Sequence, residues 1–152
     1  MSTNDHDVKI LNSLIETTID SADGYEEAAK DAENSRYMAA FQSRGLERHQ
    51  VASKLQQQVI ALGGKPDDKG TVLASAHRVF VNLRNTISKG DLAIVDEVER
   101  GEDHIKAKYE DAMKDNDVSV ATKQVITDAY ASVRQGHDQM RDLKHALHNQ
   151  QA

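Results

Sequence analysis

The segment EVERGEDHIKAKYEDAM, residues 97–113, carries an apolar stripe with one charged member. The stripe consists of Val95, Val98, Glu102, Ile105, Tyr109 and Ala112. Its steps alternate between three and four residues, the spacing that places side chains on the buried face of a bundle helix. The segment therefore predicts a bundle helix that directs the carboxylate of Glu102 into the core.

Three further segments show the same spacing and predict three more long helices. They run from Asp7 to Ala32, from Ser35 to Leu62, and from about Ser119 to His148. The turn-forming motif GGKPDDKG, residues 63–70, ends the second of them, and a shorter helix is predicted for residues 71–88. Ser35 and Asp91 are predicted to cap the helices that they precede.

The lengths of these segments predict their arrangement. Short turns join the first long helix to the second and the third to the fourth, so each pair should form an antiparallel hairpin. A helix of about 17 residues rises roughly 25 Å, enough to return the chain along the bundle. We therefore expect one all-α domain over residues 1–152: a ferritin-like, up-down-down-up four-helix bundle with a helical crossover at 71–88.

The composition excludes several classes of protein. The formal net charge of −6 argues against a nucleic-acid partner. The chain has no cysteine, which removes disulfides, thiolate metal sites and thiol catalysis. Its first ten residues, MSTNDHDVKI, do not form a signal-peptide pattern, and no stretch has the length of a membrane span. We expect a cytoplasmic protein that binds neither nucleic acid nor membranes.

Counting residues from the turns brings a polar cluster to the middle of the predicted core, with Tyr25 and His137 about one turn above the other members. Its members are Ser21, Tyr25, Arg48, Glu102, Tyr130 and His137. A carboxylate in a bundle core must be paired, coordinated or protonated. The preferred interpretation is that Arg48 pairs with Glu102 and occupies, with its own charge, the place of a metal ion.

A metal site is the alternative interpretation. Di-metal bundles take a glutamate from each of two helices and a Glu-x-x-His motif from each of the other two. The corresponding positions here are Glu47-x-x-Gln50 and Arg134-x-x-His137, so two ligands are missing. We therefore expect no cofactor, and the alternative is iron or another divalent metal in a degenerate site.

Four glycines lie inside the long helices, and the first three of them fall at nearly one level. They are Gly24, Gly45, Gly101 and Gly136. A glycine inside a helix costs about 1 kcal/mol relative to alanine, so four of them indicate a need for space. Close packing around Tyr25 and Arg48 is one explanation, and room for a ligand is the other.

The extended segment DEVERGEDHIKAKYEDAM, residues 96–113, resembles an uncharacterised bacterial family of ferritin-like four-helix bundles, a domain of unknown function. GYEEAAKDA (24–32), ERHQVASKLQQQVIALGGKP (47–66) and AHRVFVNLRNTI (76–87) are also similar to its pattern. The resemblance implies the ferritin-like fold. By analogy with true ferritins, it also implies metal ligands near Glu26, Glu47, Glu102 and His137.

No nucleophile–base arrangement and no phosphate-binding loop supports an enzymatic activity. Whether the protein is an enzyme stays open, and the preferred interpretation is a non-enzymatic, stress-associated or interaction protein with the polar core pair Arg48–Glu102. The alternatives are a metal-binding ferritin-like protein and a binder of a small ligand. A homodimer formed through helix faces is compatible with the sequence, which identifies no other protein partner.

Overall fold

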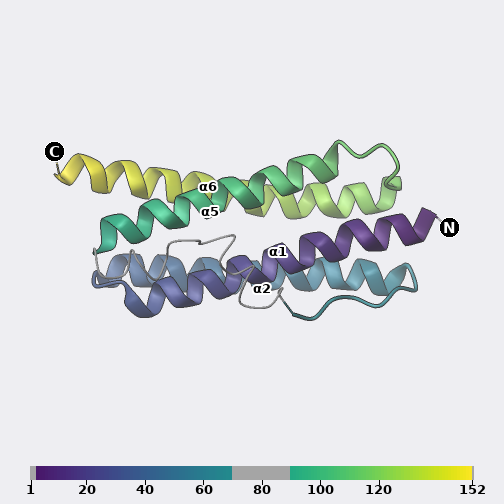
Figure 1. The fold of residues 1–152 in the computed structure, drawn as a ribbon, viewed down its shortest axis with the longest axis horizontal. Coiled ribbons are helices and arrows are strands. Elements are labelled where there is room, and N and C mark those ends of the chain that lie inside the picture. Colours follow the sequence, from purple (N-terminus) through teal and green to yellow (C-terminus); the bar gives the residue numbers. More distant parts are fainter. Residues whose placement is uncertain (1–2, 70–89, 152) are drawn as a thin grey trace.

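The computed structural model describes residues 3–69 and 90–151. Over these residues the chain forms four α-helices and no strand (Figure 1). They are α1 (Thr3–Asp31), α2 (Ser35–Ala61), α5 (Asp91–Met113) and α6 (Val120–Gln151). The all-α prediction is confirmed, whereas the crossover helix expected at 71–88 lies outside the described residues.

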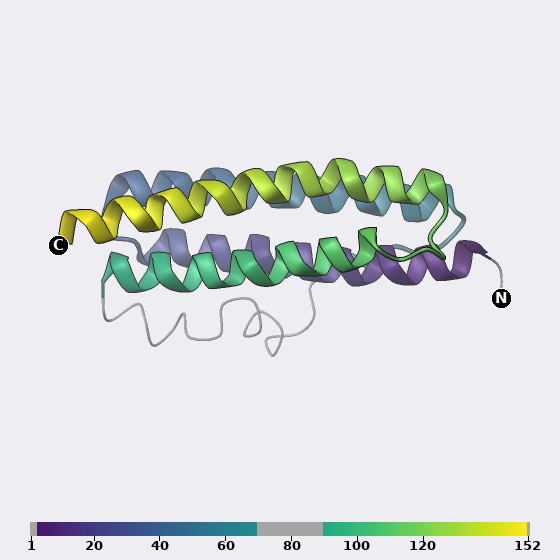
Figure 2. The ribbon, with the colours of Figure 1, turned by 90° about the horizontal axis from the view of Figure 1, so that it is seen from above.

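Helix α1 runs antiparallel to both α2 and α5. Near its start, the side-chain amide of Asn4 donates a hydrogen bond to the carbonyl of Leu62, just beyond the end of α2. Just past its other end, the backbone N–H of Glu33 donates to the carboxylate of Asp91, the first residue of α5. Helices α2 and α5 consequently run in the same direction (Figures 1 and 2).

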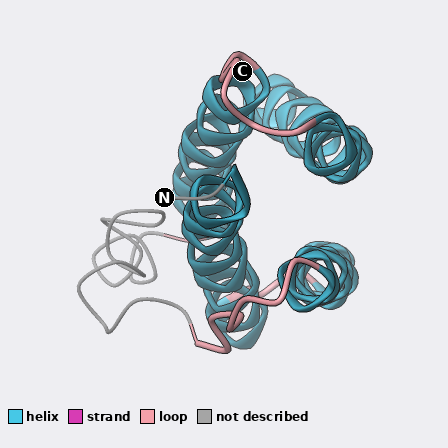
Figure 3. Cartoon of the chain, turned by 90° about the vertical axis from the view of Figure 1, so that its right-hand side faces the viewer, coloured by secondary structure: helices cyan, strands magenta, loops and turns pink. Residues whose placement is uncertain are grey.

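Helix α6 packs against α5 and α2 and runs antiparallel to both. Gln58 near the end of α2 donates to the hydroxyl of Thr122 near the start of α6, at 3.2 Å. Farther along, Arg44 of α2 donates to Gln139 of α6 at 2.6 Å. Each helix thus contacts two neighbours, and the four are seen end on in Figure 3.

The interior consists of two apolar clusters with polar residues between them. One cluster includes Leu11, Leu55, Ile105 and Ile126, and the other includes Phe41, Ile94, Val98 and Met140. The apolar stripe predicted for α5 is buried along its whole length, which confirms it. Burial of such a stripe is the main source of stability for a bundle helix.

The helix caps differ from those predicted. Asn34, rather than Ser35, caps α2, and its side chain accepts a hydrogen bond from the N–H of Arg36 at 2.9 Å. The carboxylate of Asp91 does not cap its own helix. It accepts hydrogen bonds from the backbone N–H groups of Glu33 and Asn34, both at 2.9 Å, so it fastens the start of α5 to the α1–α2 turn.

A buried carboxylate makes the corresponding connection at the opposite end of the bundle. Asp7 of α1 accepts a hydrogen bond from the backbone N–H of Ser119 at 3.0 Å and another from the hydroxyl of the same residue. Burial acts to raise the pKa of Asp7, but the hydrogen bonds from Ser119 outweigh it, and the pKa is lowered. The carboxylate therefore stays ionised and holds the start of α6 against α1.

Within the described ranges, no helix has an apolar stretch suited to crossing a membrane.

Candidate functional site

Arg48 joins all four helices from the middle of the bundle. Its guanidinium is fully buried, and Nη2 donates a hydrogen bond to Oε2 of Glu102 on α5 at 2.7 Å. Nη1 donates to the hydroxyl of Ser21 on α1 at 2.9 Å, and Nη2 lies 3.4 Å from the carbonyl oxygen of Val133 on α6. One side chain of α2 thus binds the other three helices.

Tyr25 lies against the second oxygen of the Glu102 carboxylate. Its hydroxyl donates a hydrogen bond to Oε1, while the guanidinium carbon of Arg48 lies 5.7 Å from the centre of its ring, within cation–π range. Burial, followed by the charge of Glu102, raises the pKa of Tyr25 well above its usual value. The phenol therefore stays protonated and donates to the carboxylate.

The arginine and the glutamate stabilise each other's charge. Burial acts to lower the pKa of Arg48, but the adjacent carboxylate of Glu102 outweighs it and raises the pKa above its usual value. Such a pair is costly to break because the remaining charge has no water around it. Within the described part of the chain, Nε of Arg48 has no hydrogen-bond partner, so the network does not satisfy every donor of the guanidinium.

Two of the helical glycines make room for these side chains. A Cβ atom at Gly136 would lie 2.5 Å from Nη2 of Arg48 and 3.0 Å from Cδ of Arg44. A Cβ atom at Gly45 would lie 3.3 Å from Cβ of Tyr25. At both positions the structure supports close packing around bulky side chains, the first of the two explanations for the glycines.

A second polar contact lies beside this cluster. The hydroxyl of Tyr109 on α5 is 2.7 Å from the hydroxyl of Thr18 on α1, which also donates to the carbonyl of Leu14 at 2.6 Å. Burial raises the pKa of Tyr109 to about 12. Sequence reasoning placed Tyr109 on an apolar stripe but missed its pairing with Thr18, which a threonine and a tyrosine at the same level could have signalled.

Tyr130 and His137 do not join the central cluster, which corrects the expectation for both. The hydroxyl of Tyr130 donates to Glu110 at 2.7 Å, and the tyrosine is half-buried because Ala129 takes the core position of that turn. His137 is buried, but Nε2 of its imidazole lies 2.6 Å from Asp103. The guanidinium of Arg48 fills the central space toward which the imidazole was expected to point, and α6 places Gly136 against it.

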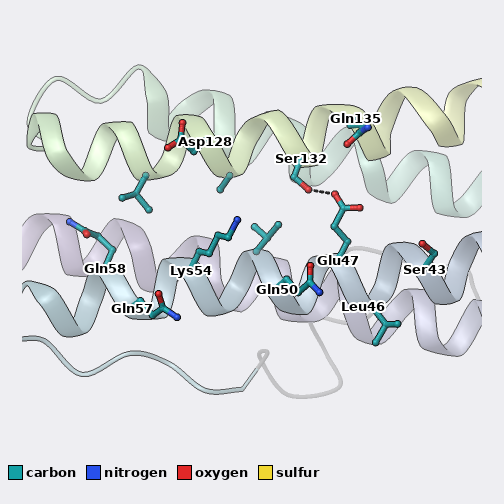
Figure 4. Close-up of a pocket in the computed structure, with 13 residues that line it drawn as sticks. Ser43, Leu46, Glu47, Gln50, Lys54, Gln57, Gln58, Asp128, Ser132 and Gln135 are labelled. Carbon is teal, nitrogen blue, oxygen red and sulfur yellow. Dashed lines mark hydrogen bonds between the residues drawn. The ribbon is translucent and has the colours of Figure 1, made fainter.

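The four ligands implied by the family resemblance do not converge. Glu26 is exposed and lies 3.0 Å from His49 on the surface. Glu47 lies in the groove between α2 and α6 (Figure 4), Glu102 is in the central cluster, and His137 is turned toward α5. These residues do not form a four-ligand cage, and a guanidinium occupies the position beside Glu102.

A groove of about 910 Å³ runs between α2 and α6. Lys54 and Asp128 line this groove. The carboxylate of Glu47 on α2 accepts a hydrogen bond from the hydroxyl of Ser132 on α6 across it (Figure 4). A smaller groove of about 680 Å³ lies between α1 and α2. Leu46, whose exposed fraction is 67%, lines both grooves and forms the ridge between them.

Two groups of carboxylates and histidine lie away from the central cluster, one of them exposed and the other partly buried. In each group, one ligand atom from every residue lies within 4.8 Å of the others. The groups are Asp23, Glu26 and His49, and Glu99, Asp103 and His137. Sequence reasoning missed both as groups, although the four-residue spacing of Glu99 and Asp103 was visible.

Comparison with known protein families identifies a match over most of the chain. The family model described as a domain of unknown function (DUF2383) matches residues 7–115, from the first turns of α1 to just beyond α5. The matched region is more than half of the chain and contains Ser21, Tyr25, Arg48 and Glu102. No curated protein matches the chain.

Proposed function

Because the chain belongs to the DUF2383 family, a domain of unknown function, we propose its role from its own geometry. The proposed role is that of a non-enzymatic, ferritin-like helical bundle protein that works through contacts with other proteins. The bacterial origin, stress association and cytoplasmic location expected above are parts of this proposal that rest on the sequence alone.

The directions of the helices support the ferritin-like topology. Helices α1 and α2 are antiparallel, α5 and α6 are antiparallel, and α2 runs in the same direction as α5. Two successive bundle helices that run in the same direction need a connection along the length of the bundle, as in ferritin-like proteins with their single long crossover.

The pairing of Arg48 with Glu102 is the observation that carries the non-enzymatic role. A di-metal centre needs several carboxylates and imidazoles around a shared space with a position open to substrate. In this bundle the guanidinium fills that space, and both oxygens of the Glu102 carboxylate accept hydrogen bonds from protein groups. The buried cluster therefore links the four helices, and the Glu102 carboxylate is occupied by protein donors rather than by a metal ion.

The outer surface of α2 supports a role in protein contacts. Leu46 projects between the two grooves, and the smaller groove adds the apolar side chains of Ala29 and Met38. Exposed apolar side chains beside a groove are typical of contact surfaces when they cluster. A second copy of the chain is the simplest partner for this surface.

Oxidation of ferrous iron tests the non-enzymatic role. Protein freed of metal by a chelator is mixed with Fe²⁺ in aerated buffer, and ferric absorbance is followed for the wild type and for Glu102→Gln. We expect the wild type and Glu102→Gln to oxidise iron at the same rate. Accelerated oxidation that Glu102→Gln abolishes would overturn the proposal and favour the metal-binding alternative.

A further inference from the structure

We propose that Glu99, Asp103 and His137 form a binding site for a divalent transition-metal ion on the α5–α6 side of the bundle. Glu99 and Asp103 are four residues apart on α5, so they share one face of that helix. His137 approaches them from α6, and one ligand atom from each of the three lies within 4.8 Å of the others. The site is distinct from the Arg48 cluster and does not depend on the proposed function.

The two nitrogens of the His137 imidazole face different carboxylates. Nε2 lies 2.6 Å from Oδ1 of Asp103, and Nδ1 lies 3.4 Å from Oδ1 of Asp138. Metal-binding histidines commonly donate their second ring N–H to a carboxylate, which fixes the tautomer. If Nδ1–H donates to Asp138, an ion that replaces the proton between Nε2 and Asp103 meets the lone pair of Nε2 in the space shared with Glu99 and Asp103.

The burial of the three side chains suits a held ion with open coordination positions. The side chains of His137 and Glu99 are only 10% and 16% exposed, whereas that of Asp103 is 60% exposed. Two ligands are thus already ordered by packing, and solvent can reach the third. Water can therefore complete the coordination shell of an ion bound there.

A positive group already lies at the edge of this site. The ammonium group of Lys144 is 3.3 Å from Oε2 of Glu99. A metal ion bound to Glu99 would compete with this ammonium group for the same carboxylate. Removal of the lysine charge should therefore strengthen metal binding, an effect that a purely structural ion pair does not predict.

The donor set indicates the class of ion. One imidazole nitrogen and two carboxylates suit Zn²⁺, Fe²⁺ or Mn²⁺, whereas Mg²⁺ and Ca²⁺ favour ligand sets made only of oxygen. The second group, Asp23, Glu26 and His49, has the same chemistry but is exposed throughout. Its exposed side chains must lose conformational freedom before they can bind an ion, so this group serves as a matched control.

Titration calorimetry with Zn²⁺ on the metal-free full-length chain tests the proposal. We expect a site whose affinity falls at least tenfold in Asp103→Asn and in His137→Ala, and by about 10–100-fold in Asp138→Asn. His49→Ala should leave this site unchanged, and Lys144→Met should tighten it. Circular dichroism confirms that each variant keeps its helices, and Asp103→Asn, at an exposed position, remains decisive if His137→Ala unfolds.

Several results would contradict the proposed metal site. Absence of Zn²⁺ binding to the wild type would do so, as would equal binding by the wild type and Asp103→Asn. If the wild type binds two ions, the proposal requires that Asp103→Asn removes one of them. Loss of all binding in His49→Ala alone would assign the ion to the exposed group instead.

Discussion

The guanidinium of Arg48 lies 2.7 Å from the carboxylate of Glu102, and neither side chain has any exposed surface. Replacing Arg48 by methionine would leave the carboxylate buried with Tyr25 as its one remaining donor among the described residues. Breaking a buried pair in this way typically costs about 3–5 kcal/mol. We expect Arg48→Met to lower the free energy of unfolding by this amount, as measured by urea denaturation.

The double variant Arg48→Met with Glu102→Leu should recover much of this loss, because no unpaired charge remains in the core. A suitable control is Arg141→Met, which removes an arginine whose side chain is 45% exposed and should change stability by less than about 1 kcal/mol. A double variant no more stable than Arg48→Met alone would show that the two side chains do not stabilise each other.

Gly136→Ala should destabilise the protein although alanine is the better helix former. The gain in helix propensity is about 1 kcal/mol, whereas overpacking a core typically costs about 1–3 kcal/mol. The new Cβ would lie 2.5 Å from Nη2 of Arg48, an atom held in place by hydrogen bonds. Gly45→Ala, where the nearest contact is 3.3 Å, should be milder in the same thermal melts. A higher melting temperature for Gly136→Ala would refute the packing argument.

The four long helices and the central pair could be predicted because both follow from the three- and four-residue spacing of the apolar side chains. The stripe of α5 passes through Glu102 without interruption, and Arg48 occupies the equivalent stripe of α2. Counting residues from the short turns then suffices to bring the two side chains to one level. The same counting placed Ser21 at that level and Tyr25 about one turn above it.

The positions of Tyr130 and His137 could not be predicted in this way, because they depend on the size of a neighbouring side chain. The guanidinium of Arg48 requires glycine at position 136, which leaves the imidazole at the edge of the core. The cluster of Glu99 and Asp103 was hidden for a different reason. Charged residues are common on the outer face of any helix, and only the approach of α6 gives these two a shared neighbour.

A dimer formed through α2 is the next prediction. A two-fold axis beside α2 would place Leu46 of each copy against the groove that contains Ala29 and Met38 of the other. We expect sedimentation equilibrium to show a dimer in the wild type and a monomer in Leu46→Glu. Ile60→Glu is the matched control, since Ile60 is 62% exposed but lines neither groove. A wild-type monomer, or equal association of Leu46→Glu and the wild type, would contradict this interface.

The stability of the protein should fall steeply in alkali because two phenols are fully buried. The pKa of Tyr109 is about 12 in the folded chain, against an ordinary value of 10.0, and the pKa of Tyr25 is also raised. The unfolded chain therefore loses these protons first as the pH rises. Each buried phenol therefore makes its full contribution to the free energy of unfolding below pH 10.0. For Tyr109 this contribution is lost as the pH rises toward about 12.

The size of this effect is measurable with the protein's own chromophores. A rise of the pKa by about two units corresponds to about 2–3 kcal/mol for Tyr109. The chain has four tyrosines and no tryptophan, so phenolate absorbance reports their ionisation without interference. Part of that absorbance should appear only together with the loss of helical circular dichroism. Tyr109→Phe should make the loss of stability with rising pH less steep, because it removes one buried phenol that must ionise. Thr18 keeps its hydrogen bond to the carbonyl of Leu14 in this variant. Ionisation of all four phenols near pH 10.0 in a chain that remains helical would contradict the burial of Tyr25 and Tyr109.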